Sequence, residues 1–248
     1  MPSKSEIIEY INKLLNIAEF DDYSVNGLQV EGKEQISKII LGVSCSERLF
    51  TEAVKRNADM ILVHHGLFWK KTSTPFTLTG FTRNRIALLI ENNINLAAYH
   101  LPLDAHPEIG NNAQILKRLK LKPIKPIEVG FLGKLEAPVP IDNFIKLVNK
   151  QLQTDSELFL FGSKKVSQVL VISGSSAIAY PLALKIFADT FIAGNIKESL
   201  VRELEEVKLN LINAGHYNTE KFGVQALGKV LERQFELTCE FVDIPNPV

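Results

Sequence analysis

Histidines in this sequence stand where apolar runs end, and two of them are followed by carboxylates. His64 and His65 are adjacent in "LVHHGLFW", in a chain with only five histidines. His100 comes four residues before an aspartate in "HLPLD", and His216 comes four residues before a glutamate in "HYNTE". Imidazole nitrogen and carboxylate oxygen suit zinc, iron, manganese or cobalt. The pattern therefore predicts a metal site.

The number of candidate ligands predicts two metal ions. Several such groups without a cysteine fit two divalent ions about 3.5–4 Å apart, and we expect Asp104 to bridge them. Neighbouring side chains on a strand point to opposite faces, so two adjacent histidines can share a site only where the strand ends. Gly66 is expected to supply the backbone freedom for that ending. The predicted ligands are His64, His65, Asp104, His216 and Glu220, with His100 as a further ligand or a proton shuttle.

Simpler interpretations exist for each of these residues taken alone. A single His64 would more often be a hydrogen-bonded core residue, but the adjacent pair favours a metal site. Asp104 and Glu220 could serve only as turn or helix caps, because Asn218 or Thr219 can begin a helix that runs to about residue 235. The histidine that precedes each carboxylate favours the metal interpretation.

Three other features bear on chemistry less directly. His106 is expected to be a loop-surface or outer-shell residue, and it is left out of the ligand set. Phe68 and Trp69 could stack on a substrate base, although core or subunit-interface packing is the commoner use of such aromatic residues. The small-residue stretch "SGSS" (173–176) could bind an anion weakly. Gly-rich phosphate loops and serine nucleophile elbows are missing from the sequence.

Short runs of Ile, Leu and Val alternate with segments of helical periodicity, which predicts an α/β fold with largely parallel sheets. The opening helix carries Ser3 and Glu6 as a capping box. Strands are expected at 38–44, 59–64, 94–100, 166–172, 189–193 and 208–214, and helices at 46–57, 82–92, 176–188 and 195–206.

The order of elements occurs twice, which predicts two similar α/β modules. "ADMILVHH" (58–65) aligns with "ADTFIAGN" (188–195), and "INLAAYHLPLD" (94–104) resembles "LNLINAGHYNTE" (209–220) with one insertion. Because ligands collect beyond the carboxyl ends of parallel strands, the duplication would gather the polar residues. Pro123 and Pro126 mark a junction, so we expect one module over residues 1–122 and another over 127–248, whose last helix and strand could pack on the first.

Composition indicates an ordinary globular protein. The 28 basic and 28 acidic residues cancel, so nucleic acid is not an expected partner. No segment reaches the roughly 18 apolar residues that span a bilayer, and no signal-peptide pattern opens the chain, so a cytoplasmic protein without membrane association is expected. Cys45 and Cys239 are expected to be reduced, non-catalytic thiols.

Four ordered stretches resemble the NIF-three-like dinuclear metal-centre family, whose members are often called GTP cyclohydrolase 1 type 2 homologues. They are "NGLQVEG" (26–32), "LVHHGLFW" (62–69), "HLPLDAHPEIGNNAQI" (100–115) and "GHYNTEKFGVQAL" (215–227). The resemblance implies two bound metals, a toroidal homohexamer, and the short form without an inserted domain. Several relatives carry Gly-Gly-Val where this chain has "EIGNN", so the substrate contacts of that loop do not transfer.

Two functions are compatible with these features. One is a metal-dependent hydrolase of a nucleotide or related small molecule, in which paired ions activate water and His100 transfers protons. The family label implies opening of the guanine imidazole ring of GTP with release of formate. The other is a non-enzymatic metal-binding or scaffold protein, for which a closed coordination shell would be expected.

Overall fold

The computed structural model describes residues 1–70, 77–175 and 187–247. The chain forms two compact units: Met1–Leu103 with Val224–Ile244, and Asp104–Gly223 with Pro245–Val248. This division does not coincide with the junction that Pro123 and Pro126 suggested. Those prolines lie in an edge strand of the second unit, where a residue without an N–H group interrupts no central ladder.

The first unit is built on a five-stranded sheet with the order β1-β4-β3-β2-β11. β4, β3, β2 and β11 are parallel neighbours, and β1 is antiparallel to β4. The strands are β1 (Gly27–Val30), β2 (Lys38–Ser44), β3 (Met60–His65), β4 (Asn95–Ala98) and β11 (Thr238–Phe241).

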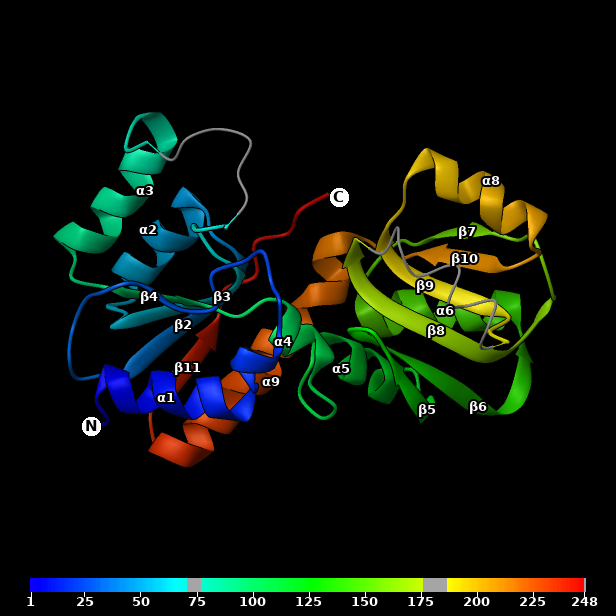
Figure 1. The fold of residues 1–248 in the computed structure, drawn as a ribbon, viewed down its shortest axis with the longest axis horizontal. Helices are drawn as coiled ribbons and strands as arrows, with labels where there is room; N and C mark the ends of the chain where they lie inside the picture. The colour runs from blue at the N-terminus through cyan, green and yellow to red at the C-terminus, as the bar shows by residue number, and fades with distance from the viewer. Residues whose placement is uncertain (71–76, 176–186, 248) are drawn as a thin grey trace. The chain divides into compact units, whose positions relative to one another are not determined.

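Helices cover both faces of this sheet (Figure 1). α2 (Glu47–Lys55) and α3 (Gly80–Glu91) bury Phe50 and Leu89 against Ile61 of β3. On the other face, Gly228 of α9 (His216–Phe235) approaches Leu41 of β2 so closely that a Cβ would lie 2.3 Å from its side chain. α1 (Lys4–Leu14) begins with the capping box that the sequence predicted, and a short 3-10 helix (Ile17–Glu19) follows it.

The second unit is built on a six-stranded sheet with the order β5-β6-β8-β9-β10-β7. β8, β9 and β10 are parallel, whereas β5, β6 and β7 make antiparallel pairs. The strands are β5 (Lys122–Ile127), β6 (Gly130–Pro140), β7 (Glu157–Phe159), β8 (Lys165–Ser175), β9 (Thr190–Asn195) and β10 (Asn210–Asn213). The α/β prediction with mixed, largely parallel sheets is confirmed.

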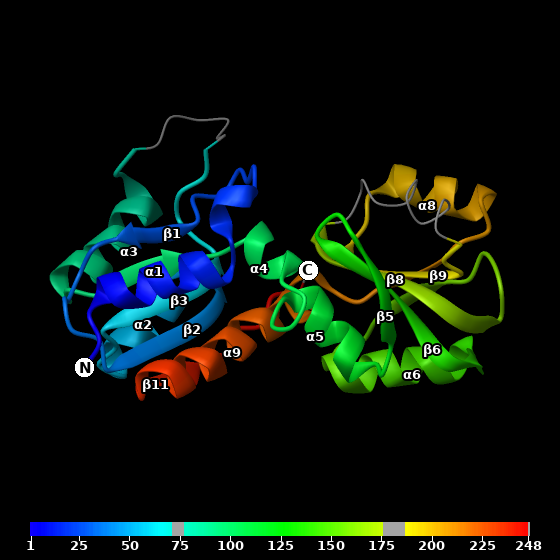
Figure 2. The ribbon, with the colours of Figure 1, turned by 60° about the horizontal axis from the view of Figure 1, so that its bottom comes forward.

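Helices again pack on both faces of the second sheet (Figure 2). α5 (Asn111–Arg118) and α6 (Ile141–Leu152) share one core with β6 and β8, and α8 (Glu198–Glu206) packs with the opposite side chains of β8 and β9. The short helix α4 (Leu101–Ala105) contains the last residues of the first unit and the first residues of the second. Most of the helix predicted at 176–188 lies outside the described residues.

The order of elements that the sequence repeats corresponds to a set of three neighbouring parallel strands in each sheet. β2, β3 and β4 are consecutive parallel strands of the first unit, and β8, β9 and β10 are consecutive parallel strands of the second. The aligned segments 58–65 and 188–195 contain the middle strand of each set. Among the described residues, no helix is both long enough and apolar enough to cross a membrane.

Candidate metal centre

The histidine pair occupies the last two positions of β3, where the sheet loses one of its ladders. β3 pairs with β4 only as far as Val63, whose partner is Ala98, but it pairs with β2 as far as His65, whose partner is Ser44. The strand is therefore held on one side only at its final residues. The two imidazole rings consequently lie near each other, with centroids 4.7 Å apart, in place of the opposed orientation of a regular strand.

Gly66 contributes to this strand ending by its small size. Its backbone is not in the left-handed region, so the expectation that it supplies unusual backbone freedom is wrong. A Cβ at this position would lie 2.3 Å from the Gln29 side chain. That amide accepts hydrogen bonds from the backbone N–H groups of Leu67 and Phe68. Glycine thus leaves room for the amide of Gln29, which fills the space that a side chain would take.

His100 joins the pair, so that three imidazoles form one cluster in the first unit. Its ring centroid lies 5.0 Å from that of His64 and 5.6 Å from that of His65. One nitrogen from each ring can be chosen so that all three lie within 4.8 Å of one another. His64 and His100 are buried and His65 is partly buried. The predicted gathering of these three residues is therefore present within one unit.

Each of the three rings has its Nδ1 atom bound to a protein group, at 2.9 Å in every case. His64 Nδ1 donates to the carbonyl oxygen of Tyr99, and His100 Nδ1 donates to Oδ1 of Asp22. His65 Nδ1 pairs with the hydroxyl of Ser44. An imidazole that binds a metal through Nε2 ordinarily donates its Nδ1–H to such a group. Nε2 is thus the nitrogen that each ring would present to an ion or to a reactant.

Asp22 is a site residue that the sequence did not reveal. It is buried, and its carboxylate accepts hydrogen bonds from His100, Asn26, and the backbone N–H groups of Ser24 and Leu101. Burial raises the pKa of this carboxyl, but the bonds from His100, Asn26 and Ser24 outweigh burial and lower the pKa to about 2. An ionised Asp22 fixes the His100 tautomer that carries its proton on Nδ1.

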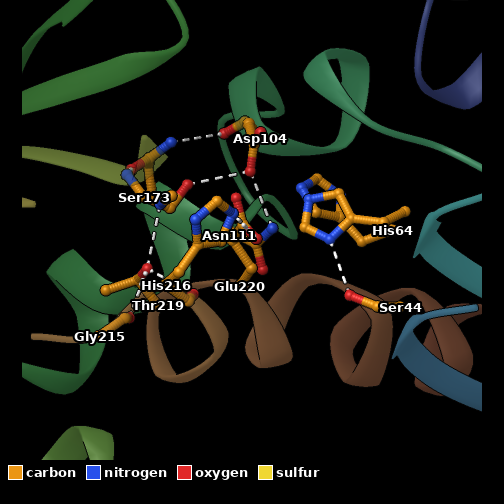
Figure 3. A network of polar contacts seen from close by, with 12 residues as sticks. Ser44, His64, Asp104, Asn111, Ser173, Gly215, His216, Thr219 and Glu220 are labelled. Atoms are coloured by element: carbon orange, nitrogen blue, oxygen red, sulfur yellow. Dashed lines mark hydrogen bonds and ion pairs between the residues drawn. The ribbon is translucent and has the colours of Figure 1, made fainter. Parts of the chain in front are cut away.

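Asp104 opens the second unit at the end of α4 and is almost fully buried. Its Oδ1 accepts hydrogen bonds from Asn111 Nδ2 at 2.8 Å and from Ser173 Oγ at 3.0 Å (Figure 3). Both donors are side chains, so these bonds do not make Asp104 a helix cap. Asn111 is itself held by the backbone N–H of Gly223, which donates to its Oδ1. Buried side chains thus fix the position of this carboxylate.

His216 and Glu220 lie one turn apart at the start of α9. His216 Nε2 is 2.9 Å from Glu220 Oε2, and a Glu220 oxygen lies within 4.8 Å of an Asp104 oxygen. Glu220 is only 2% exposed and Asp104 only 3%. Two carboxylates buried this close together repel each other unless a cation or a proton offsets their charge. The second unit therefore supplies an acidic half-site that suits a divalent ion.

A glycine makes room for this half-site. Gly174, at φ +63, lies so close that a Cβ would meet Glu220 Oε1 at 2.0 Å and His216 Nε2 at 3.2 Å. Its N–H donates to Thr219 Oγ1, and the N–H of Ser173 donates to Asn112 Oδ1. These two N–H groups are consequently engaged, and the weak anion site expected at "SGSS" is not supported by the described residues 173–175.

The structure also bears on the predictions for the start of α9, for His106 and for the two cysteines. α9 begins at His216, so the expectation that Asn218 or Thr219 begins this helix is wrong. His106 Nδ1 accepts the backbone N–H groups of Glu108 and Ile109, which is a turn-stabilising role. Cys45 is a free thiol whose pKa is raised by burial, and burial raises the pKa of the free Cys239 thiol to about 12. Neither cysteine is poised as a nucleophile.

The donor set of each unit fits divalent metal ions. Three imidazoles with anchored Nδ1 atoms converge in the first unit, and two buried carboxylates with one imidazole converge in the second. Nitrogen and oxygen donors of this kind suit zinc, iron or manganese better than metals that prefer sulfur.

Comparison with known proteins gives one consistent family. Residues 2–247 match the family model described as Duf34/NIF3 (NGG1p interacting factor 3). Proteins named "GTP cyclohydrolase 1 type 2 homolog" are 40% identical in Escherichia coli (strain K12) and 39% identical in Yersinia pestis, with 98% of both chains covered. A solved protein of Thermus thermophilus has a TM-score of 0.92 at 36% identity, over 99% of this chain and 100% of its own.

Proposed function

This chain belongs to the Duf34/NIF3 family, and from that premise we propose that it binds two divalent metal ions and uses them to hydrolyse a nucleotide or a related small molecule. The observation that carries the proposal is the cluster of three imidazoles whose Nδ1 atoms are all anchored. Such anchoring is typical of metal ligands, and a hydrogen-bonded core histidine does not require two further imidazoles beside it.

The proposed ligands are the five residues expected from the sequence. His64 and His65 would supply nitrogen donors, and Asp104, His216 and Glu220 would complete the set. Zinc, iron or manganese is the proposed metal.

When bound, such ions supply Lewis acidity and lower the pKa of water. The residues of this chain bind and orient the reactants. Asp22 holds the proton of His100 on Nδ1 through the bond of 2.9 Å, so His100 presents Nε2 as a base. In the proposed reaction, His100 takes a proton at Nε2, and the Asp22 carboxylate stabilises the resulting cation.

The substrate to test first is GTP, because the relatives share the name of a GTP cyclohydrolase homologue. Opening of the guanine imidazole ring would release formate. We place the reaction in the cytoplasm, in keeping with the two free thiols.

Elemental analysis tests the ligand assignment. We expect His64→Ala and Glu220→Ala to lose most bound metal and to stay folded by circular dichroism. His106→Ala is the matched control, because His106 stabilises a turn and is outside the ligand set. Full metal occupancy in both ligand variants would refute the assignment.

Activity is tested separately, with zinc-, iron- or manganese-loaded protein incubated with GTP and a panel of phosphoesters. Formate and phosphate are the readouts. His100→Ala should retain metal and lose turnover if His100 transfers protons, and should lose metal if it is a ligand.

A non-enzymatic role as a metal-binding or scaffold protein is the alternative. It is favoured by the tight packing of Asp104, which already accepts two side-chain hydrogen bonds on one oxygen. Full metal content without turnover of any compound in the panel would support it. In either role we propose a ring-shaped homohexamer, which light scattering during gel filtration would test.

A further inference from the structure

Two aromatic rings border the histidine cluster of the first unit. Tyr23 and Trp69 stack with centroids 5.5 Å apart and an angle of 25° between their planes. Their centroids also lie 5.1 Å and 5.4 Å from that of His100, and Trp69 lies 6.1 Å from His65. Tyr23 and Trp69 are called the aromatic wall below. The wall directly adjoins two of the three clustered imidazoles.

Core packing does not account for this pair. Tyr23 is 52% exposed, and Trp69 is only partly buried. Within the described part of the chain, Phe50 is the one aromatic residue of the buried cluster that contains Ile61 of β3 and Leu89 of α3, and neither member of the wall belongs to that cluster. Exposed aromatic surface beside a polar site is characteristic of binding surfaces.

The wall is held in position by the backbone. The segment around Tyr23 pairs with the segment around Trp69 through an antiparallel bridge between Ser24 and Trp69. The N–H of Lys70 donates to the carbonyl of Tyr23, and the N–H of Val25 donates to the carbonyl of Phe68. A surface that is already ordered loses little conformational entropy when a ligand binds.

We infer that the aromatic wall is a subsite that stacks against a planar heteroaromatic ring of the substrate, such as a nucleobase. This inference rests on the proposed function, because it assigns the wall to the molecule that the metal centre transforms. A cationic ligand would be attracted by aromatic faces, but it would be repelled by divalent ions bound to the neighbouring imidazoles. A neutral planar ring gains from stacking without that repulsion.

The sequence offers a direct probe of the wall, because Trp69 is the only tryptophan in the chain. Zinc-loaded protein is titrated with GMP, AMP and ribose 5-phosphate while tryptophan fluorescence is recorded. N-acetyltryptophanamide corrects for light absorbed by the bases, and calorimetry gives the dissociation constants independently. We expect both nucleotides to change Trp69 fluorescence and to bind about tenfold more tightly than ribose 5-phosphate, which has no base.

Variants identify the ring that contributes. Tyr23→Ala should weaken nucleotide binding about tenfold and leave the affinity for ribose 5-phosphate unchanged, whereas Tyr23→Phe should bind like the wild type. Phe81→Ala is the matched control, because Phe81 is an exposed aromatic residue of α3 in the same unit. Equal affinities for GMP, AMP and ribose 5-phosphate, or an unchanged nucleotide affinity in Tyr23→Ala, would overturn the inference.

Failure of the wall and failure of the metal centre give different results. Metal content is measured in every sample, and each titration is repeated after chelation. Wild-type protein that binds no zinc but still prefers nucleotides to ribose 5-phosphate would contradict the proposed function and support the wall. Protein that binds zinc and shows no preference for nucleotides would contradict the wall alone.

Discussion

Each of the two sheets contains a set of three consecutive parallel strands, but the two sets end on different residues. β3 of the first unit ends on His64 and His65, whereas the aligned β9 of the second unit ends on Gly194 and Asn195. In the first unit the strand ends carry an imidazole cluster. In the second unit the ends of β9 and β10 line a pocket of about 530 Å³ that includes Asn195, along with other amide and carboxylate side chains.

Away from the strand ends, the two units use the same polar supports. Asp59 accepts the N–H groups of Ser37 and Lys38, and the aligned Asp189 accepts those of Ser167 and Gln168. Each aspartate immediately precedes the middle strand of its set, and its hydrogen bonds connect that strand to the neighbouring strand.

A second pair of supports also matches. Asn95 accepts the N–H of Gly32 and donates to the carbonyl of Lys33. Asn210 accepts the N–H of Gly162 and donates to the carbonyl of Ser163. The two units thus share the polar residues that hold these strands, and they differ in the residues on which the strands end.

The largest expected difference between the units concerns metal binding at the aligned strand ends. His65→Ala removes a proposed ligand and should lower metal affinity more than about 100-fold, above the 10–100-fold that the loss of a strong supporting partner typically costs. Asn195→Ala, the change at the aligned position, should leave affinity unchanged. Titration with a zinc-sensitive dye measures both. An equal loss in the two variants would show that the strand ends are not functionally distinct.

The sequence predicted the parallel strands of both units, but β1, β5, β6, β7, α5 and α6 were not predicted. The alternating apolar runs located β2, β3, β8 and β9, and the histidine spacing selected residues that the structure gathers within each unit. Asp22 could not be found in this way, because it reaches His100 from 78 positions earlier and has no local pattern around it. Such contacts depend on tertiary packing, which a period along the chain does not encode.

The boundary between the units was also hidden from the sequence. Proline commonly marks the end of a helix or strand, but Pro123 and Pro126 lie within β5 at the edge of a sheet. The first division falls inside the short helix α4, between Leu103 and Asp104, and the chain returns to the first unit inside α9, at Val224. No composition change marks that position.

The aligned aspartates test whether the shared supports contribute equally. Asp59→Ala should lower the free energy of unfolding by about 3 kcal/mol and Asp189→Ala by about 2 kcal/mol, because hydrogen bonds to charged groups contribute about 1.5–3 kcal/mol. The larger loss is expected for Asp59, which is buried and also binds Lys33 Nζ at 2.7 Å. Urea unfolding followed by circular dichroism measures both losses.

The Asp59 carboxyl also makes the stability of the protein depend on pH. Burial raises the pKa of Asp59, but the bonds from Lys33 and Ser37 outweigh burial and lower the pKa below its usual value. A carboxyl whose pKa is lower in the folded state stabilises the protein above its unfolded pKa of about 3.9, and this contribution is lost as the pH falls through the folded value. The free energy of unfolding of Asp59→Asn should therefore fall less than that of the wild type between about pH 5 and pH 2, where carboxyl groups titrate. Parallel pH curves would contradict this.

A bulge in the second unit provides the next test. Gly42 and Ser44 of β2 pair with Val63 and His65, which is regular, but the corresponding register of β8 shifts between Ile172 and Ser175. Gly174 lies in this shift and faces Glu220. The bulge therefore explains how the second unit accommodates a carboxylate beside its strand end.

Gly174→Ala should cost about 1 kcal/mol for the left-handed backbone and about 1–3 kcal/mol more for the clash with Glu220. Gly80→Ala is the control, because Gly80 is also left-handed, at φ +52, but a Cβ there would meet nothing within 4 Å. It should show only the backbone cost. Thermal unfolding compares them, and equal losses would mean that Glu220 moves aside without cost.

The smallest effect is expected at two serines that occupy corresponding strand positions. Ser44 pairs with His65 across β2 and β3, and Ser175 pairs with Asn195 across β8 and β9. Only Ser44 supports a predicted ligand, through its hydroxyl 2.9 Å from His65 Nδ1. Ser44→Ala should weaken zinc binding about threefold, because an exposed neutral hydrogen bond contributes roughly 0.5–1 kcal/mol. Ser175→Ala should change nothing, and the dye titration used for His65→Ala resolves the difference. A Ser44→Ala variant with wild-type affinity would mean that β3 alone orients His65, so that the hydroxyl merely fills space beside the ring.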